Sequence, residues 1–134
     1  MTAVVDCSIV IRLLSNVEGD ELLRQRLART VHAPALIDAE IASVVRGFAI
    51  TSKPNLRIRV DRAEQMLIDY AGLRIVRYPM QPLQRRAFAL RDNLTAYDAM
   101  YVALAESLDV PLLTDDTKFA GAPGHRADVH LYPD

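Results

Sequence analysis

The sequence predicts an α/β fold in which a mainly parallel β-sheet lies between two layers of helices, a three-layer α/β/α sandwich. Short apolar segments that are typical of buried strands alternate along the chain with longer segments of helical periodicity. Parallel strands need crossover connections, and helices usually supply them. The 134 residues suit one domain with its own core, so residues 1–134 are interpreted as a single domain.

The first half of the chain is expected to contain two strands and four helices. Asp20 can cap a helix, Pro34 is tolerated in the first turn of the helix that follows it, and Gly72 is a plausible stop signal. Pro54 and Asn55 separate two of the helices. The expected elements are a strand at Ala3–Val5, helices at Ser8–Leu14 and from Asp20 to about Arg29, a strand at Val31–Ala33, and helices from Ala35 to about Thr51 and at Val60–Ala71.

The second half is expected to contain three strands and two helices. Residues 73–78 alternate as in a strand, Pro82 lies near the start of a helical segment, and Thr95 is a good helix cap. The expected elements are a strand at Leu73–Tyr78, helices at Pro82–Arg91 and Thr95–Leu108, a buried strand at Val110–Leu113 and a weaker strand at Asp128–Tyr132.

Composition excludes several classes of protein. The net charge is −1, so the overall charge of the protein would not attract a nucleic acid. A nucleic-acid partner would have to bind at a local basic patch. The single cysteine, Cys7, cannot form an internal disulfide, which fits a cytoplasmic protein. The N-terminal segment has no basic region before its apolar run, and no segment is long and apolar enough for a membrane span. We therefore expect a cytoplasmic protein with no membrane partner.

Acidic residues lie beside several elements that are expected to be buried. Asp6 follows the first strand, and Asp115 and Asp116 follow the strand at Val110–Leu113. Ligands of open α/β sheets bind outside the C-terminal ends of the strands. Asp98 lies in the first turn of its helix, where the helix dipole favours a carboxylate, and Glu40 lies among apolar neighbours on the long helix.

Carboxylates that converge on one cleft repel one another unless they take up protons or a cation neutralises them. Oxygen ligands of this kind suit Mg²⁺ or Mn²⁺, which can activate water and offset charge on a phosphodiester. Zinc is disfavoured because His32, His125 and His130 have no metal-ligand spacing with one another or with Cys7.

Four segments resemble the VapC group of PIN-domain endoribonucleases, in the order and spacing of that family. They read VVDCSIVIRLL, PALIDAEIASVVR, LRDNLTAYDAMYVALAE and LLTDDTKF. The resemblance implies a PIN-like fold and a Mg²⁺- or Mn²⁺-dependent ribonuclease that is the toxin of a type II toxin–antitoxin pair. Its acids map onto Asp6, Glu40, Asp98 and Asp116, which would hold metal and carry catalysis. Cys7 is a small departure, since the family often has Thr or Ser there.

Supporting residues and partners are also implied. Ser8, Thr114 and Asp115 are expected to orient the acids, although Ser8 can equally be a cap. The partners would be an RNA substrate, a cognate antitoxin and a second copy in a homodimer, with the helices at Val60–Ala71 and Thr95–Leu108 as candidate dimer surfaces. The antitoxin is expected to pack near Leu36–Arg46 and Ala49–Ile58 and to direct an Arg or Lys at the carboxylates.

Each residue taken alone has a simpler interpretation. Asp6 can be a helix cap, Asp98 a complement to the helix dipole, and the Asp115–Asp116 pair a turn. Asp38 is about 200° around the helix from Glu40 and should face elsewhere. The basic cluster is equally compatible with a solvated surface and with a rim for RNA or a partner; its members are Arg46, Lys53, Arg57, Arg59 and Arg62.

Other functions remain possible from the residues. A response-regulator receiver needs paired acids after the first strand, but here the pair comes late in the chain. A phosphatase of the haloacid dehalogenase type needs a second acid two residues after Asp6, where this chain has Ser8. The remaining alternative is a PIN-like protein that binds a partner without catalysis. A metal titration combined with a nuclease assay would distinguish such a protein from the enzyme.

Overall fold

The computed structural model describes residues 2–15, 20–27 and 29–132, and its centre is a five-stranded parallel sheet. The strand order is β3-β2-β1-β4-β5, with every neighbouring pair parallel. The strands are β1 (Val4–Val5), β2 (Val31–Pro34), β3 (Ile75–Tyr78), β4 (Leu112–Thr114) and β5 (Val129–Leu131). The predicted α/β fold class is therefore confirmed.

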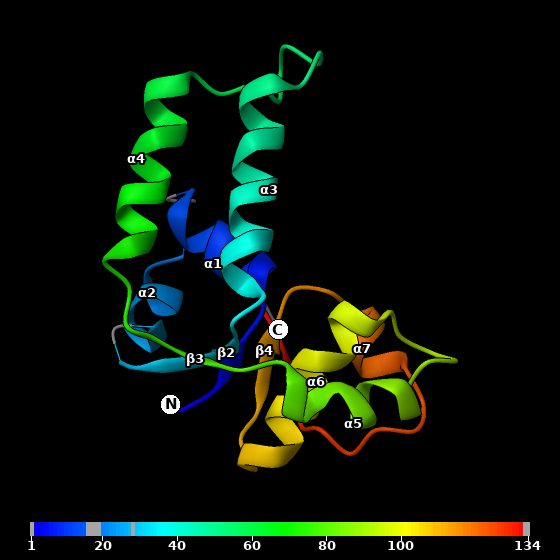
Figure 1. The fold of residues 1–134 in the computed structure, drawn as a ribbon. Helices are drawn as coiled ribbons and strands as arrows, with labels where there is room; N and C mark the ends of the chain where they lie inside the picture. The colour runs from blue at the N-terminus through cyan, green and yellow to red at the C-terminus, as the bar shows by residue number, and fades with distance from the viewer. Residues whose placement is uncertain (1, 16–19, 28, 133–134) are drawn as a thin grey trace.

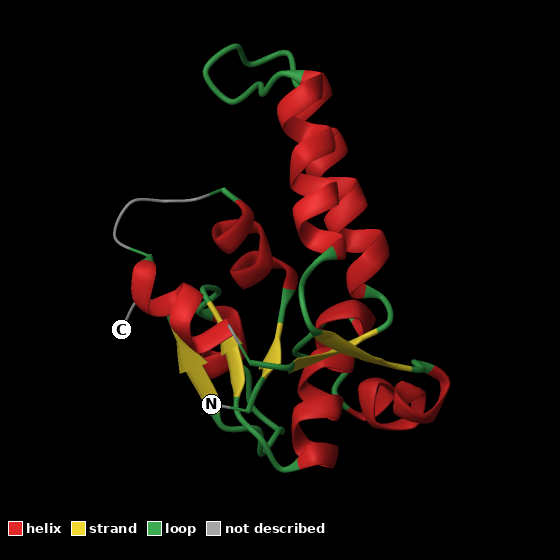
Figure 2. Cartoon of the chain, turned by 90° about the vertical axis from the view of Figure 1, so that its left-hand side faces the viewer, coloured by secondary structure: helices red, strands yellow, loops and turns green. Residues whose placement is uncertain are grey.

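Helices connect successive strands and cover both faces of the sheet (Figure 1). They are α1 (Cys7–Leu14), α2 (Glu21–Leu27), α3 (Ile37–Ile50), α4 (Val60–Ala71), the 3-10 turn η1 (Gln81–Leu83), α5 (Gln84–Ala89), α6 (Ala96–Leu108) and α7 (Lys118–Gly121). Helix α6 packs against β1, β2 and β4, and α5 packs on α6. Helices α3 and α4 lie side by side and project beyond the sheet (Figures 1 and 2).

The core explains why α6 is apolar on nearly every side. Its residues Ala99 and Tyr101–Ala105 are buried, because the helix is enclosed between the sheet and α5. The strands β1 and β4 contribute Val4, Val5, Leu112 and Leu113, all fully buried. Apolar runs in strands covered on both faces are typical of parallel sheets. No helix in the described part of the chain is long and apolar enough to cross a bilayer.

Some element boundaries differ from the sequence-based predictions. The segment expected as one helix at Pro82–Arg91 is a 3-10 turn followed by the six-residue α5. The end of the helix predicted from Asp20 extends over residue 28, which lies outside the described residues. The short helix α7 was not predicted, because a four-residue helix has too few residues to show a period.

Asp20 directly precedes α2, and its backbone oxygen accepts from the Arg24 N–H at 3.0 Å, as in the first bond of a helix. Its buried carboxylate also accepts bonds from two distant side chains. Arg12 Nε donates at 2.8 Å and the Tyr132 hydroxyl at 2.8 Å. The guanidinium of Arg12 also lies 5.1 Å from the centre of the Tyr132 ring. This group joins α1, the start of α2 and the residue that follows β5, so it fixes the end of the chain to the first helix.

Candidate active site

Asp6 and Asp116 follow two central strands that are hydrogen-bonded neighbours. Val5 of β1 is in register with Leu113 of β4; Asp6 comes directly after β1, and Asp116 comes two residues after the end of β4. Helix α6 brings Asp98 in its first turn, and α3 carries Glu40 in its first turn. The topology thus places the four predicted acids around the C-terminal ends of the central strands, as expected for ligand sites in parallel α/β sheets.

Asp6 is buried, with 6% of its surface exposed, and both of its carboxylate oxygens accept hydrogen bonds. Oδ1 accepts from the Ser8 hydroxyl at 2.6 Å and from the Ile9 amide at 3.3 Å, which makes Asp6 the cap of α1. Oδ2 accepts from the Thr114 hydroxyl at 2.5 Å. Capping therefore does not exclude a role in the candidate site, because the capping carboxylate also accepts bonds from Ser8 and Thr114.

The surroundings of Asp6 make its ionised form expensive. Burial raises the pKa of this carboxyl, and the bonds from Ser8, Thr114 and Ile9 only partly oppose that rise. The nearby carboxylate of Asp115 raises it further. Asp115 itself is exposed, and its backbone N–H donates to Ser8 Oγ at 3.3 Å. A positive ion beside Asp6 would relieve these costs.

Glu40 is half-buried and accepts a short hydrogen bond from the Tyr101 hydroxyl of α6. Burial raises the pKa of Glu40, the Tyr101 bond lowers it, and the charge of Asp98 raises it again. Glu40 and Asp98 are therefore electrostatic neighbours even though they come from different helices. Asp38 faces another way, as predicted: it binds Tyr70 at 2.6 Å and Arg77 at 2.9 Å.

Asp98 and Asp116 share one cation, the ammonium group of Lys118. Its Nζ lies 2.9 Å from Asp98 Oδ2 and 3.1 Å from Asp116 Oδ2. Burial favours a raised pKa at Asp116, but the backbone and side-chain bonds from Lys118 outweigh it and lower that pKa. Thr95 caps α6 by accepting from the Asp98 amide at 3.2 Å, and its hydroxyl donates to Asp98 Oδ2 at 3.1 Å.

The Cys7 thiol lies near acids from different elements, namely Asp6, Glu40 and Asp115. Burial raises the pKa of its thiol to about 12, and the charges of Glu40, Asp6 and Asp115 contribute. The thiol therefore stays protonated at neutral pH and is a poor nucleophile. The same observation shows that Asp6 and Glu40 both lie near Cys7.

The acids surround one region, but they are not close enough together to form the coordination sphere of a single metal ion. Among the described residues, no three His, Cys, Asp or Glu side chains are close enough together to hold one metal ion. The donors are nonetheless all carboxylate oxygens, in excess over the single nearby lysine, and this chemistry fits Mg²⁺ or Mn²⁺. The histidines bind elsewhere: His32 to Tyr78, His125 to the Phe119 carbonyl and His130 to Asp128.

Two residues of this region were not predicted as site residues. Tyr101 lies one helical turn after Asp98, so both residues are on the same face of α6. Lys118 had no detectable signal, because it begins the unpredicted helix α7. The basic residues Arg46, Lys53, Arg57 and Arg59 are exposed, and the last three lie at or near the tip of the α3–α4 hairpin.

Comparison with known proteins identifies the family of this chain. Residues 3–124 match the family model described as the PIN domain. The chain is 39% identical to Ribonuclease VapC1 of Mycobacterium tuberculosis over 134 residues, which covers 96% of each protein. It is 34% identical to Ribonuclease VapC12 of the same species over 129 residues, or 96% of this chain and 97% of that protein.

Solved structures have the same fold at lower sequence identity. VapBC2 from Rickettsia felis, bound to a promoter DNA fragment, matches with a TM-score of 0.69 at 14% identity and 98% coverage of both chains. FitAcB from Neisseria gonorrhoeae matches with a TM-score of 0.60 at 21% identity and 96% coverage of both. The chain belongs to the PIN-domain family and, within it, to the VapC group.

Proposed function

We propose that this protein is a metal-dependent endoribonuclease and the toxin of a toxin–antitoxin pair in the cytoplasm. The observation that carries the proposal is the arrangement of Asp6, Glu40, Asp98 and Asp116 around the C-terminal ends of β1 and β4. The relatives at 34% and 39% identity are named ribonucleases, which supports RNA as the substrate.

Asp6 and Asp98 would be the main ligands of Mg²⁺ or Mn²⁺, with Glu40 and Asp116 completing the ligand set or orienting water. A bound ion of this kind lowers the pKa of water and offsets charge on a phosphodiester. Ser8 and Thr114 hold the Asp6 carboxylate in one orientation through hydrogen bonds of 2.6 and 2.5 Å. Tyr101 does the same for Glu40.

The residues of the site favour direct attack by water over a covalent intermediate. Cys7 is held as a thiol, and the Ser8 hydroxyl is committed to Asp6. No histidine pair is present to activate the ribose 2′-hydroxyl, since the three histidines bind other groups. Hydrolysis should therefore leave a 5′-phosphate and a 3′-hydroxyl.

The test is cleavage of a structured RNA with and without EDTA, followed by mapping of the product ends. We expect cleavage only with Mg²⁺ or Mn²⁺, and 5′-phosphate ends. Cyclic phosphate ends or cleavage that resists EDTA would contradict the mechanism. A protein that binds its partner but cleaves no RNA with either metal would instead be the non-catalytic PIN-like protein.

We further propose that the antitoxin binds along the α3–α4 hairpin and reaches the acids from there. The hairpin bears a patch of large exposed apolar residues, here called the hairpin patch: Ile50, Leu56, Val60, Leu67 and Ile68. A helical rise of 1.5 Å per residue puts Thr51 about 16 Å from Glu40 along α3. The basic residues near the tip are thus better placed for a partner than for the scissile phosphate.

Replacing Ile68 and Val60, each 64% exposed, with glutamate should weaken antitoxin binding by about a hundredfold, because each change places a charge in an apolar contact. Leu22→Glu on α2 is the matched control, since Leu22 is also exposed but lies outside the hairpin patch. Calorimetric titration with the purified antitoxin measures its affinity for the hairpin-patch variant and for the Leu22→Glu control. Equal affinities for the variant, the control and the wild type would refute this surface.

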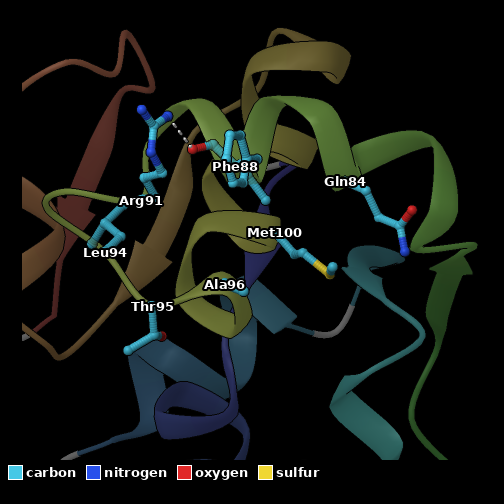
Figure 3. Close-up of a pocket in the computed structure, with 8 residues that line it drawn as sticks. Gln84, Phe88, Arg91, Leu94, Thr95, Ala96 and Met100 are labelled. Atoms are coloured by element: carbon cyan, nitrogen blue, oxygen red, sulfur yellow. Dashed lines mark hydrogen bonds between the residues drawn. The ribbon is translucent and has the colours of Figure 1, made fainter.

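The homodimer stays a prediction, and one surface feature favours it. A groove of about 410 Å³ beside the start of α6 is lined largely by apolar side chains, including Phe88, Leu94 and Met100 (Figure 3). Phe88 is 67% exposed, an unusual state for a large aromatic side chain. The molecular mass in solution checks the prediction, and a monomer at micromolar concentration would contradict it.

A further inference from the structure

Lys118 is held at both ends by the acids it neutralises. Asp116 Oδ1 accepts from its backbone N–H at 3.0 Å, and Asp116 Oδ2 lies 3.1 Å from its Nζ. The same Nζ lies 2.9 Å from Asp98 Oδ2. One ammonium group therefore stands between two of the four carboxylates that the proposed function assigns to metal binding.

The surroundings of Lys118 allow the ammonium group to leave without disturbing the core. Its side chain is 50% exposed, and it lies over the ring of Phe119 with Nζ 5.6 Å from the ring centre. A lysine side chain is a flexible stem with a compact charge at its end, so rotation about the stem can carry Nζ into water. The buried Phe119 anchors α7 while this happens.

We propose that Lys118 is a tethered cation that takes the place of the divalent metal between Asp98 and Asp116 and has to leave when the metal binds. The inference rests on the proposed metal-dependent function. In the metal-free protein the lysine relieves the repulsion between the two carboxylates. On metal binding, the same oxygens cannot serve both cations, and the two positive charges repel each other.

This role makes Lys118 a positioning residue that sets metal affinity. The competition has a limited size because the ion pair is partly exposed, and exposed pairs contribute little free energy. Removing the charge should therefore tighten metal binding by about tenfold, which corresponds to about 1.4 kcal/mol. If Lys118 instead helped to hold the metal, or only stabilised α7, removing its charge would not increase the affinity for the metal.

The experiment is a calorimetric titration of Mn²⁺ into metal-free protein, without RNA, for the wild type and four variants. Lys118→Met and Lys118→Gln remove the charge and should each bind Mn²⁺ about tenfold more tightly. Lys118→Arg retains the charge and should bind within about twofold of the wild type. Arg74→Met is the matched control, because it removes one positive charge at the start of the edge strand β3, at the N-terminal ends of the strands, whereas the acids lie at the C-terminal ends.

Melting curves provide a second measurement on the same samples. Without metal, Lys118→Met should melt below the wild type, and added Mn²⁺ should raise its melting temperature by more than it raises that of the wild type. Mn²⁺ binding to the wild type with unchanged or weaker affinity in Lys118→Met and Lys118→Gln would overturn this inference alone. The absence of Mn²⁺ binding in every variant would overturn the proposed function, and this inference with it.

Discussion

Replacing Asp98 with asparagine is expected to lower the rate of RNA cleavage at saturating Mg²⁺ by at least about a hundredfold. The change keeps the shape of the side chain and removes the charge that would hold the cation. Lost electrostatic stabilisation of this kind typically costs two to three orders of magnitude in rate. Single-turnover cleavage of a structured RNA is the measurement, and Asp6→Asn should show a comparable loss.

The two variants should differ in stability, which separates the chemical effect from the structural one. Asp98 is partly exposed, so its replacement should leave the fold intact. Asp6 is buried and accepts three hydrogen bonds, so its replacement should also destabilise the protein by about 1–3 kcal/mol. Asp69→Asn, which changes an exposed acid of α4, is the control. Wild-type cleavage by a folded Asp98→Asn protein would exclude Asp98 from the site.

Replacing Arg86 with methionine is expected to lower the free energy of unfolding by about 3 kcal/mol. Arg86 donates two bonds to the Glu106 carboxylate, at 2.7 and 2.9 Å, and that carboxylate is only 2% exposed. Removing one partner of a buried pair leaves an uncompensated charge, which costs more than the pair itself contributes. Urea unfolding at pH 7 measures the loss.

The loss in free energy of unfolding caused by Arg86→Met should depend on pH, and the protonation of Glu106 sets the direction of this dependence. The bonds from Arg86 lower its pKa from the ordinary value of 4.5, although burial acts in the opposite sense. The pair therefore stabilises the wild type fully above pH 4.5, and this contribution is lost as the pH falls through the lower folded-state pKa. In Arg86→Met the unpaired carboxyl protonates readily in acid, so the difference from the wild type should narrow below about pH 5.

Arg126 provides the matched control for this pair. Its guanidinium lies 3.9 Å from Glu106 and its side chain is 75% exposed, so Arg126→Met should cost less than about 1 kcal/mol. Equal losses in the two variants, or a deficit in Arg86→Met that does not change with pH, would show that the buried carboxylate is not the cause.

The long apolar segments made most of the fold predictable from the sequence. The strand that ends just before Asp6 and the helix capped by Thr95 are both apolar segments with a clear boundary residue. The short 3-10 turn and α7 have too few residues for such a pattern, and they depend on contacts made by the folded chain. Asp20 shows the same limit: the local sequence indicates its position at the start of α2 but not the bond from Tyr132, which lies 112 residues away.

The sequence indicates the four candidate acids and the bonds from Ser8 and Thr114 to Asp6, but not the contacts made by Tyr101 and Lys118. The four family segments name Asp6, Glu40, Asp98 and Asp116, and the topology brings them to one end of the sheet. Whether a carboxylate is paired with a cation depends on side-chain geometry, which no motif encodes. Lys118 therefore became visible only through its distances to Asp98 and Asp116.

The hydrogen bond between Asp6 and Thr114 has a consequence for protein synthesis. The Asp6 carboxylate is made 108 positions before the Thr114 hydroxyl that completes its environment. β1 is the central strand of the sheet and pairs with β2 and β4, so one of its two edges stays unpaired until β4 has been made. A nascent chain on the ribosome thus carries no assembled acidic site until Thr114 has been made and can reach Asp6.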